Sequence, residues 1–351
     1  MNSMVTQRSA FMDGRCLDKF QEKPKLLIAG KRHVRVSVVS SSHKPDHSIK
    51  VGILGASGLT GGQLIPFIAK HPFMDITLMT AEDEAGQSIE SVFPHLVMHT
   101  WLLYRMRISL VLMLSSLVYR LAQVRKLSKV FRDFTLRDVN DYVEWYGQPQ
   151  KARELQKEAV YGLTEIHRKK IQSARLVANP GCYPTAILLP LVPLIRANLV
   201  TSEHIVIFSN SGVSETVPEI DQELSDAANS KVAVSFISTQ KLISQGLVLV
   251  IHVQMAPGAS VEDLKQHLIE FYEKEEFVVP LAGDQAPNTK DVQGSNSCHI
   301  NVFPDCAPGT AIIVSVIDKL VKGASGQALQ NLNLMMGFSE NVGLSRVPLP
   351  L

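Results

Sequence analysis

The sequence is poor in cysteine and aromatic residues and carries almost no net charge. Four cysteines are scattered over 351 residues, and aromatic residues make up 6%. Cysteines this sparse do not build a disulfide scaffold and supply no zinc-ligand pairs, so we expect a reducing compartment and no metal site. Lysine and arginine number 35 against 33 aspartates and glutamates. This balance gives no reason to expect a partner nucleic acid.

A long apolar run is also missing. The apolar run at residues 108–119 is uncharged over only 12 residues, whereas a membrane helix needs about 20. We therefore expect no membrane segment. The same region has an unusual composition, because residues 91–132 contain no aspartate or glutamate but seven lysines or arginines.

What the chain does have is material for a sizeable core. Hydrophobic residues make up 45% and charged residues 19%, which fits a globular protein and excludes general disorder. The length favours two domains. Residues 1–48 differ from the rest in being basic and rich in serine, which is compatible with an organelle transit peptide. Asp13, Asp18 and Glu22 are unusual in such peptides, so a plain extension is the alternative.

A glycine-rich loop marks the start of the folded part. The apolar run 51–54 predicts a buried strand, residues 64–69 place Leu64, Ile65, Ile68 and Ala69 on one helical face, and residues 76–79 predict a second strand. Between first strand and helix, glycines allow a tight turn that exposes helix N–H groups to a pyrophosphate. This context favours a dinucleotide site over a ligand-free turn. The candidate cofactor-binding residues are Gly55, Ala56, Ser57, Gly58, Leu59, Thr60 and Gly61.

The choice of nicotinamide cofactor is weakly indicated by the end of the second strand. Glu82 and Asp83 follow it, and an acidic residue there suits the free ribose hydroxyl of NAD. No arginine follows closely to hold a 2′-phosphate. Taken alone, these residues favour NAD.

A cysteine lies at a second strand-to-helix junction. Residues 176–178 are apolar, residues 179–185 read Asn-Pro-Gly-Cys-Tyr-Pro-Thr, and an apolar helix is expected over 186–195 despite Pro190 and Pro193. A helix N-terminus stabilises a thiolate, which makes Cys182 a candidate nucleophile. The alternative is a buried structural cysteine. A thiolate beside a nicotinamide indicates acyl chemistry: the thiolate forms a thioester, and hydride reduces it to an aldehyde, helped by a general acid/base, most often histidine.

These features together resemble N-acetyl-gamma-glutamyl-phosphate reductase, a relative of aspartate-semialdehyde dehydrogenase. The similarity covers most of residues 49–351. The residues in the matching blocks look most like those of the plant branch, whose members are imported into chloroplasts. The matching blocks beyond the glycine loop and the cysteine turn lie at residues 85–87, 91–96, 145–147, 158–163, 211–214, 217–220, 255–258, 294–296 and 322–333.

The resemblance implies an α/β fold with a Rossmann-type NADP-binding domain over residues 49–181. A mixed α+β catalytic and dimerisation domain would span 182–321, and a final helix, 322–351, would return to the first domain. It implies NADPH in place of NAD, a homo-oligomer, N-acetylglutamyl phosphate as substrate and a chloroplast location. Gly323 and Asn331 would approach the nicotinamide. Asn179 and Ser211 would bind substrate.

The chain departs from the family in two main places. Residues 97–132 replace a strand, a turn over the cofactor and a helix; this stretch is either diverged or read from another frame, and Thr135 stands where the family has a substrate arginine. Between Ser214 and Val217 the family has a longer segment that ends in its general acid/base histidine, whereas this chain has only Glu215 and Thr216. Loss of such a group typically costs about 10²–10⁴-fold in rate.

Two functions therefore stay open. One is the NADPH-dependent reduction of N-acetyl-L-glutamyl 5-phosphate in arginine biosynthesis, with Cys182 as nucleophile. The other is a catalytically impaired member, or a faulty gene product, that retains NADP binding or subunit pairing. His204, His252, His267 and His299 carry no motif that would make one of them a replacement. Residues 238–250 predict a disturbed strand pair without an assigned function.

Overall fold

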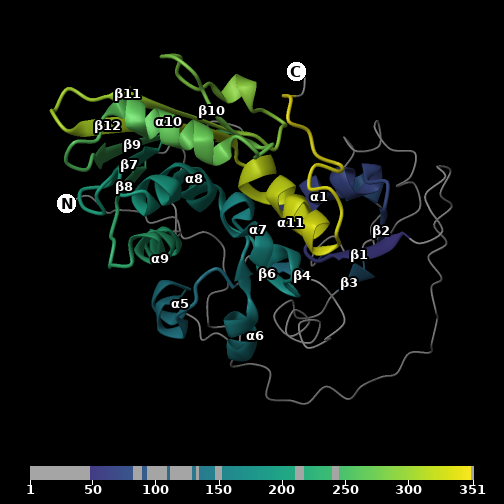
Figure 1. Cartoon of the computed structure of the whole chain (residues 1–351). Coiled ribbons are helices and arrows are strands. Elements are labelled where there is room, and N and C mark those ends of the chain that lie inside the picture. Colours follow the sequence, from purple (N-terminus) through teal and green to yellow (C-terminus); the bar gives the residue numbers. More distant parts are fainter. Residues whose placement is uncertain are drawn as a thin grey trace, which may run out of the picture. The chain divides into compact units, whose positions relative to one another are not determined.

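The computed structural model describes residues 48–81, 89–92, 109–110, 129–131, 134–146, 152–209, 217–238 and 245–348. The expected transit peptide, Glu82 and Asp83, Ser211 and most of residues 97–132 lie outside the described residues. Figure 1 shows the arrangement of the helices and strands along the chain.

The glycine-rich start forms the predicted strand, helix and strand. β1 (Ile49–Ile53) and β2 (Met74–Ala81) pair in parallel, and α1 (Leu59–Lys70) connects them. The helix buries Ile65, Ile68 and Ala69 because their spacing places them on one face. It ends at His71, since the following Pro72 disfavours helix at the preceding residue. The predicted elements are confirmed, with α1 starting at the glycine loop itself.

The remaining elements of this half form a second small parallel sheet. β3 (Ser109–Leu110) extends the first sheet beside β2, and β6 (Leu176–Ala178) lies between β4 (Lys129–Phe131) and β5 (Val160–Tyr161). Two short strands, β3 and β4, therefore lie within the acid-free stretch, β3 near its middle and β4 at its end. The helices here are α2 (Ile89–Val92), α5 (Val139–Tyr146), α6 (Arg153–Glu158) and α7 (Thr164–Gln172).

The predicted apolar helix after the cysteine turn is α8 (Cys182–Arg196). Thirteen of its 15 residues are buried, so it is a core helix with no solvent-facing stripe. Pro190 and Pro193 lie inside it, and Asn198, with a φ of 54°, follows its end in the left-handed region. Packing on all sides stabilises a helix that two prolines would weaken in water.

A six-stranded sheet makes up most of the second half. Its strand order is β10-β11-β12-β9-β7-β8, and α8 and α10 pack on one of its faces. The capping box of Ser260 and Asp263 fixes the start of α10. The bounds are β7 (Val206–Ser209), α9 (Val217–Ala228), β8 (Ser235–Ser238), β9 (Gly246–Gln254), α10 (Val261–Tyr272), β10 (Val278–Pro280), η3 (Thr289–Asp291), β11 (Cys298–Pro304) and β12 (Thr310–Asp318).

The region predicted as a disturbed strand pair contains the end of β8 and the start of β9. β9 is regular over nine residues and lies in the interior of the sheet, between β12 and β7. Its leucines Leu247 and Leu249 are fully buried. The strand is therefore a full member of the sheet and not a damaged edge.

The tail begins with a π-helical turn, η4 (Val321–Ser325), and continues as α11 (Gly326–Met335). This helix lies within the tail, residues 322–351, in which the resemblance implied a final helix. Its apolar residues Ala328, Leu329, Leu332 and Met335 have helical spacing, but they are not its most buried side. Leu329 is buried, whereas Ala328, Leu332 and Met335 are half-buried, and Gln327, Gln330 and Asn331 are fully buried. The polar residues on its other side have the more buried positions.

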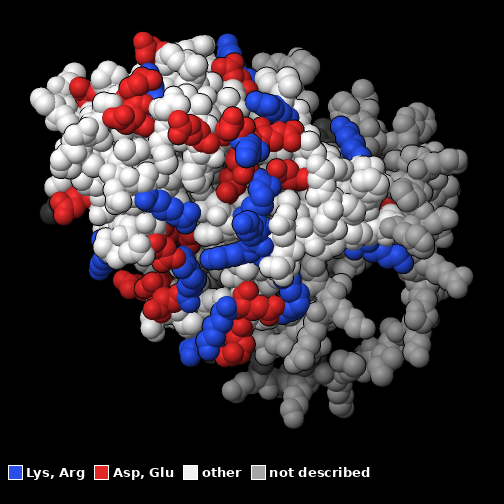
Figure 2. All heavy atoms as spheres, viewed as in Figure 1, with Lys and Arg blue, Asp and Glu red and all other residues white. Residues whose placement is uncertain are grey.

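Charged side chains on the visible surface alternate in sign over short distances. Figure 2 shows a band of lysine and arginine around α7, with aspartate and glutamate over α10 on one side and around α9 on the other. Four ion pairs contribute to this alternation: Arg168 of α7 contacts Glu275 and Glu340, and Arg137 contacts Glu223 and Asp226. Within the described part of the chain, no helix has both the length and the apolar character to span a membrane.

A buried histidine joins the end of α1 to α11. His71 is fully buried; its Nδ1 accepts the N–H of Phe73 at 3.2 Å, so its Nε2 carries the proton and donates to Asn333 Oδ1 at 3.1 Å. The ring of Phe73 stacks on the ring of Phe338, with 5.0 Å between their centroids. The tail is thus fixed to the first strand–helix–strand unit by a neutral imidazole.

Replacing His71 tests this connection. We expect His71→Ala to lower the free energy of unfolding by about 3 kcal/mol, because it opens a cavity and leaves buried hydrogen-bonding groups of Asn333 and Phe73 unpaired. Urea denaturation measures the change. Lys70→Ala, at the exposed neighbouring position, is the matched control and should change it by less than about 0.5 kcal/mol. Equal effects of the two substitutions would contradict this role of His71.

Candidate active site

Cys182 is the first residue of α8. Gly181 caps the helix with an extended backbone (φ −75°, ψ 173°) and no side-chain cap. The N–H of Thr185 and its hydroxyl both donate to the Gly181 carbonyl, at 3.1 and 2.8 Å. The half-buried thiol of Cys182 is therefore carried by the N-terminal residue of α8, where the helix dipole favours negative charge. This is the strand-to-helix position expected from the sequence.

The backbone of Gly323 lies directly against Cys182. A Cβ placed on Gly323 would be 2.5 Å from Cys182 Cβ and 3.0 Å from its Cα, which no real side chain could occupy without a shift. The φ of Gly323 is not positive, so backbone conformation does not require glycine here. The close approach to Cys182 does. The tail segment that the resemblance implied thus reaches the candidate nucleophile.

Asn331 and Asn179 form a hydrogen-bonded cluster beside this contact. Asn331 Nδ2 donates to the Gly162 carbonyl at 2.8 Å and to Asn179 Oδ1 at 3.1 Å, and its Oδ1 accepts the Thr164 hydroxyl at 2.8 Å. Asn179 Nδ2 donates to the carbonyl of Ala324 at 3.2 Å. Because the amide of Asn331 is fully buried and used by protein partners, it holds the chain around Cys182.

The glycine-rich loop is anchored to the end of β2. The N–H of Gly55 donates to Thr80 Oγ1 at 3.1 Å, and the N–H of Ala56 to the Thr80 carbonyl at 2.7 Å. Gly55 has a φ of 66°, which glycine adopts without strain. A Cβ on Gly61 would lie 2.2 Å from the Gly55 carbonyl oxygen, so the start of α1 can pack on the loop only with glycine there.

The N-terminus of α1 suits an anion. Gly58 makes no side-chain cap hydrogen bond, and Gly58, Leu59 and Thr60 are exposed. The first-turn N–H groups of an α-helix have no intrahelical acceptors, and the helix dipole favours negative charge there. The residues present therefore fit the pyrophosphate of a dinucleotide. Ser57, half-buried in the loop, can add a hydroxyl.

The π-helical turn η4 brings the two candidate regions together. It packs against both α1, which follows the glycine loop, and α8, which begins with Cys182. Of the sequence-predicted residues, the structure therefore places Cys182, Gly323, Asn179 and Asn331 in one cluster. It places the Gly55–Gly61 loop at the start of the helix that packs on the same turn.

A buried glutamate joins this cluster, and the sequence analysis did not select it. Glu219 of α9 is 1% exposed; its Oε1 accepts the Tyr161 hydroxyl at 2.7 Å and the N–H of Gly181 at 3.4 Å. Burial, and next the charge of Glu219, raise the pKa of Tyr161 well above its usual value, so the phenol stays protonated. The signal in the sequence was the Val-Pro-Glu-Ile block at residues 217–220, which contributed only to the resemblance to the family.

The family's arginine position is occupied by a buried threonine. Thr135 is 2% exposed, and its carbonyl accepts Gln222 Nε2 at 3.0 Å. Arg137, two residues on, pairs with Glu223 and Asp226 of α9. Its guanidinium is therefore used to fasten α9 to this segment.

Three histidines each lie within hydrogen-bonding distance of a side chain other than Cys182. His71 contacts Asn333, His167 Nε2 lies 3.3 Å from Glu223 Oε2, and His252 Nδ1 lies 3.3 Å from Asp305 Oδ2. His204 has a φ of 58° in a loop and His267 lies on α10. These contacts give none of the five a catalytic role.

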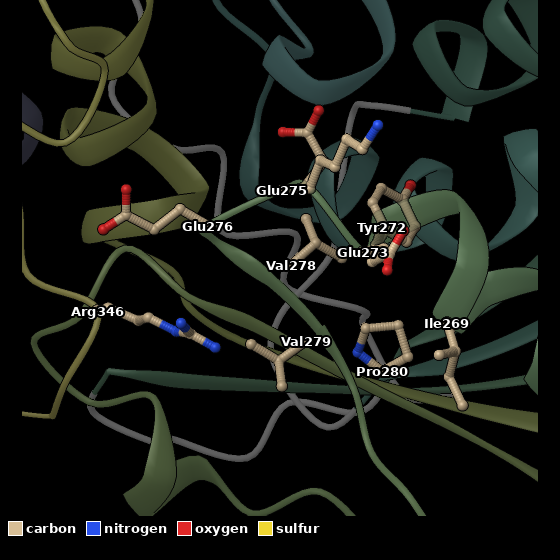
Figure 3. Close-up of a pocket in the computed structure, with 10 residues that line it drawn as sticks. Ile269, Tyr272, Glu273, Glu275, Glu276, Val278, Val279, Pro280 and Arg346 are labelled. Carbon is tan, nitrogen blue, oxygen red and sulfur yellow. The ribbon is translucent and has the colours of Figure 1, made fainter.

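A surface pocket lies elsewhere, at the end of α10 and along β10. Figure 3 shows Glu273, Glu275 and Glu276 around it, with Arg346 approaching from the C-terminal segment. Its lining includes neither Cys182 nor any residue of the glycine loop. We therefore place the candidate active site at the Cys182 cluster.

Comparison with known proteins identifies two domains of one family along the chain. Residues 50–109 match the family model "Semialdehyde dehydrogenase, NAD binding domain", and residues 182–216 and 215–319 match "Semialdehyde dehydrogenase, dimerisation domain". The fold resembles aspartate semialdehyde dehydrogenase II from Vibrio cholerae, with a TM-score of 0.58 at 14% identity over 83% of this chain and 99% of that one. A second solved relative is aspartate semialdehyde dehydrogenase with NADP from Candida albicans, with a TM-score of 0.51 at 12% identity over 84% and 99%.

Sequence relatives are closer. "Probable N-acetyl-gamma-glutamyl-phosphate reductase, chloroplastic" from Arabidopsis thaliana is 46% identical, over 94% of this chain and 96% of its own length. The protein of the same name from Oryza sativa is 45% identical, over 90% and 88%. N-acetyl-gamma-glutamyl-phosphate reductase from Afipia carboxidovorans is 38% identical, over 85% and 97%.

The fold and the cysteine at the head of α8 thus define a dehydrogenase of the semialdehyde type. Within that class, the chain belongs to the N-acetyl-gamma-glutamyl-phosphate reductase family. The fold class and the family predicted from the sequence are both confirmed.

The comparisons also bear on the shortened segment before α9. The dimerisation-domain match is divided in two at residues 215–216. The alignment with the Arabidopsis relative has 385 positions, more than the 351 residues of this chain, so that relative carries residues without a counterpart here. The divided match is in keeping with a shorter segment between Ser214 and Val217.

The glycine loop gives a direct test of the anion site. We expect Gly61→Ala to weaken binding of NADPH by at least about tenfold, because its methyl group would displace the Gly55 backbone and the first-turn N–H groups. Fluorescence titration with NADPH and with NADH measures it. Gly52→Ala is the control, since its added Cβ would only touch Leu78 at 3.6 Å. Unchanged affinity in Gly61→Ala would place the dinucleotide elsewhere.

Proposed function

We propose that this chain reduces N-acetyl-L-glutamyl 5-phosphate to N-acetyl-L-glutamate 5-semialdehyde, with NADPH as reductant and release of phosphate, in arginine biosynthesis. The observation that carries the proposal is the position of Cys182 at the N-terminus of α8, in contact with Gly323 and next to the Asn179–Asn331 cluster. The names of the relatives supply the substrate and the pathway.

The residues around Cys182 account for the acyl chemistry. The thiolate attacks the acyl carbon, the carbon–oxygen bond to phosphate breaks, and a thioester on Cys182 results. The dipole of α8, which begins at Cys182, would stabilise the negative charge that develops on the attacked carbonyl oxygen. After reduction, collapse of the tetrahedral adduct releases the aldehyde and restores the thiolate. Asn179, pinned by Asn331 and Ala324, keeps the turn before Cys182 in place.

The cofactor proposed is NADP(H), held by the Gly55–Gly61 loop through its pyrophosphate; when bound, it supplies the hydride. Gly323 and the turn η4 would form the protein surface nearest the nicotinamide, with Asn331 acting behind them as a positioning residue. The proposed domains are 49–181 for the cofactor, 182–321 for catalysis and dimerisation, and 322–351 as the segment that returns to the first domain. The contacts of η4 with both α1 and α8 support these bounds. The first arm, residues 1–48, would be a transit peptide directing the chain to the plastid, as the names of the plant relatives suggest.

A homo-oligomer is proposed from the uncovered face of the six-stranded sheet. One cross-strand row on this face contains Ile237, Phe208, Val250 and Val314, which are directly opposite one another in register. Ile237 is 47% and Phe208 41% exposed, although both lie in a sheet. An apolar face of this kind is buried in a partner, and the family-model name supports a second copy of the chain.

The second candidate function is that of an impaired member. The divided family match and the longer alignment favour it, since a missing segment before α9 would remove the general acid/base histidine. Such a chain would still bind NADPH and pair with another subunit, because the glycine loop and the sheet face are intact.

An activity assay distinguishes the two. Purified protein is mixed with N-acetylglutamate semialdehyde, NADP and phosphate, and NADPH absorbance is followed. We expect turnover that falls by roughly 10³-fold or more in Cys182→Ser, while NADPH affinity stays unchanged. Cys306→Ser, at an exposed thiol, is the control and should retain activity. NADPH binding without turnover in the unsubstituted chain would establish the impaired member instead.

The sheet face is tested by charge insertion. Phe208→Asp should shift the protein from dimer to monomer at micromolar concentration, because an unpaired carboxylate would be buried in the interface. Phe271→Asp, at an equally exposed phenylalanine of α10, is the control. Sedimentation velocity measures both. A Phe208→Asp protein that sediments as the native dimer would exclude this face.

A further inference from the structure

Lys322, the residue before Gly323, is held in a fully buried ion pair. Its Nζ donates to Glu165 Oε1 at 2.7 Å and to Gln330 Oε1 at 2.9 Å, and neither charged side chain of the pair is exposed. The ring of Phe277 lies 5.9 Å from Nζ. Two charges removed from water carry a desolvation penalty that the pairing rarely exceeds by much. A contribution to stability is therefore a weak explanation for the pair.

The surroundings fix both partners but leave them incompletely satisfied. Gln330 Nε2 donates to Glu165 Oε1 at 3.0 Å and to Glu340 Oε2 at 2.9 Å, and Gln330 Oε1 also accepts Asn296 Nδ2 at 2.9 Å. Glu165 Oε2 is buried and finds no hydrogen-bond donor among the described residues. The arrangement thus fixes the position of the Lys322 ammonium, while one oxygen of the Glu165 carboxylate has no hydrogen-bond donor among the described residues.

The Glu165 carboxyl of the pair is ionised at neutral pH. Burial alone would raise the pKa of Glu165, but the charge of Lys322 and the hydrogen bonds from Lys322 and Gln330 outweigh it and lower that pKa. The nearby Cys298 does not compete for Lys322, because burial raises the pKa of its thiol to about 12.

The pair fixes one side of Gly323, and the asparagine cluster fixes the other. Glu165 is in the first turn of α7 and Gln330 is in α11, so the Lys322 side chain connects η4 to two helices. On the other side, the Ala324 carbonyl accepts Asn179 Nδ2 at 3.2 Å. Gly323, which presses on Cys182, therefore lies between two anchored neighbours.

We propose that Lys322 and Glu165 are positioning residues that hold Gly323 against Cys182 and so keep the thiol over the N-terminus of α8. Lys322 acts through Gly323 and touches neither substrate nor cofactor. The inference rests on the proposed role of Cys182 as nucleophile. Without the pair, Gly323 withdraws, the Cys182 side chain gains rotamer freedom, and the helix N-terminus stabilises the thiolate less.

The test measures the alkylation of Cys182 by iodoacetamide against pH in the full chain, without substrate or turnover. Peptide mass spectrometry follows Cys182, with the exposed Cys306 as an internal reference. We expect Lys322→Met to raise the midpoint by about one pH unit and to slow alkylation at neutral pH by about tenfold. Lys265→Met is the matched control. Lys265 lies on α10, its side chain is 12% exposed, and its Nζ is 3.1 Å from a carboxylate oxygen of Asp284. It should leave the profile unchanged.

A double-mutant cycle decides whether Lys322 acts through Gly323. Gly323→Ala alone should also slow alkylation, and the Lys322→Met/Gly323→Ala protein should be slower than Gly323→Ala by less than about twofold. Additive effects, about a hundredfold together, would overturn the proposal, as would a native profile in Lys322→Met.

A neutral pair separates positioning from stability. Lys322→Met leaves Glu165 buried and unpaired, and this variant can fail to fold. Glu165→Gln/Lys322→Met leaves no unpaired charge and is expected to fold. If it has the native melting temperature and the native alkylation profile, the pair is only structural and the proposal is wrong. If Cys182 in the unsubstituted chain reacts no faster than Cys306, the nucleophile assignment itself fails, which is a distinct result.

Discussion

The close approach of Gly323 to Cys182 is the contact on which the rest of the site depends. A single methyl group on Gly323 would overlap Cys182 Cβ at 2.5 Å. The contact joins the tail of the chain to the first turn of α8, and the same tail packs on α1 behind the glycine loop. The nucleotide-binding loop and the nucleophile are therefore both supported by one short segment, and any shift of that segment would move both.

This segment is held mainly by polar side chains. Gln327, Gln330, Asn331 and Asn333 of α11 are fully buried, and three of them have amide groups bonded to α7, α1 or the turn before Cys182. Hydrogen bonds fix direction as well as distance, whereas apolar contacts allow neighbouring packings of similar energy. A buried polar face thus gives the tail one position relative to Cys182. The cost is visible in Gln327 Oε1 and Glu165 Oε2, which are buried without donors among the described residues.

The sequence predicted the parts of this site that depend on local rules. Glycine spacing located the loop and α1, Pro72 located the end of that helix, and the Pro-Gly-Cys turn located the start of α8. The final helix was implied only by the resemblance, and its apolar spacing does not reveal that Gln327, Gln330 and Asn331 are its most buried residues, because periodicity reports hydrophobicity and not hydrogen-bond partners. Glu219 and the Lys322–Glu165 pair were not found for a related reason. Their partners lie 38 or more residues away in sequence, and only the tertiary fold reveals them.

The order of the elements along the chain has a consequence for synthesis. The cysteine turn leaves the ribosome well before residues 322–331. Until that stretch emerges, Asn179 lacks Asn331, Glu165 lacks Lys322, and Cys182 lacks the Gly323 backbone against it. During synthesis the candidate nucleophile is therefore present before its support, and the emergence of residues 322–331 completes the cluster around it.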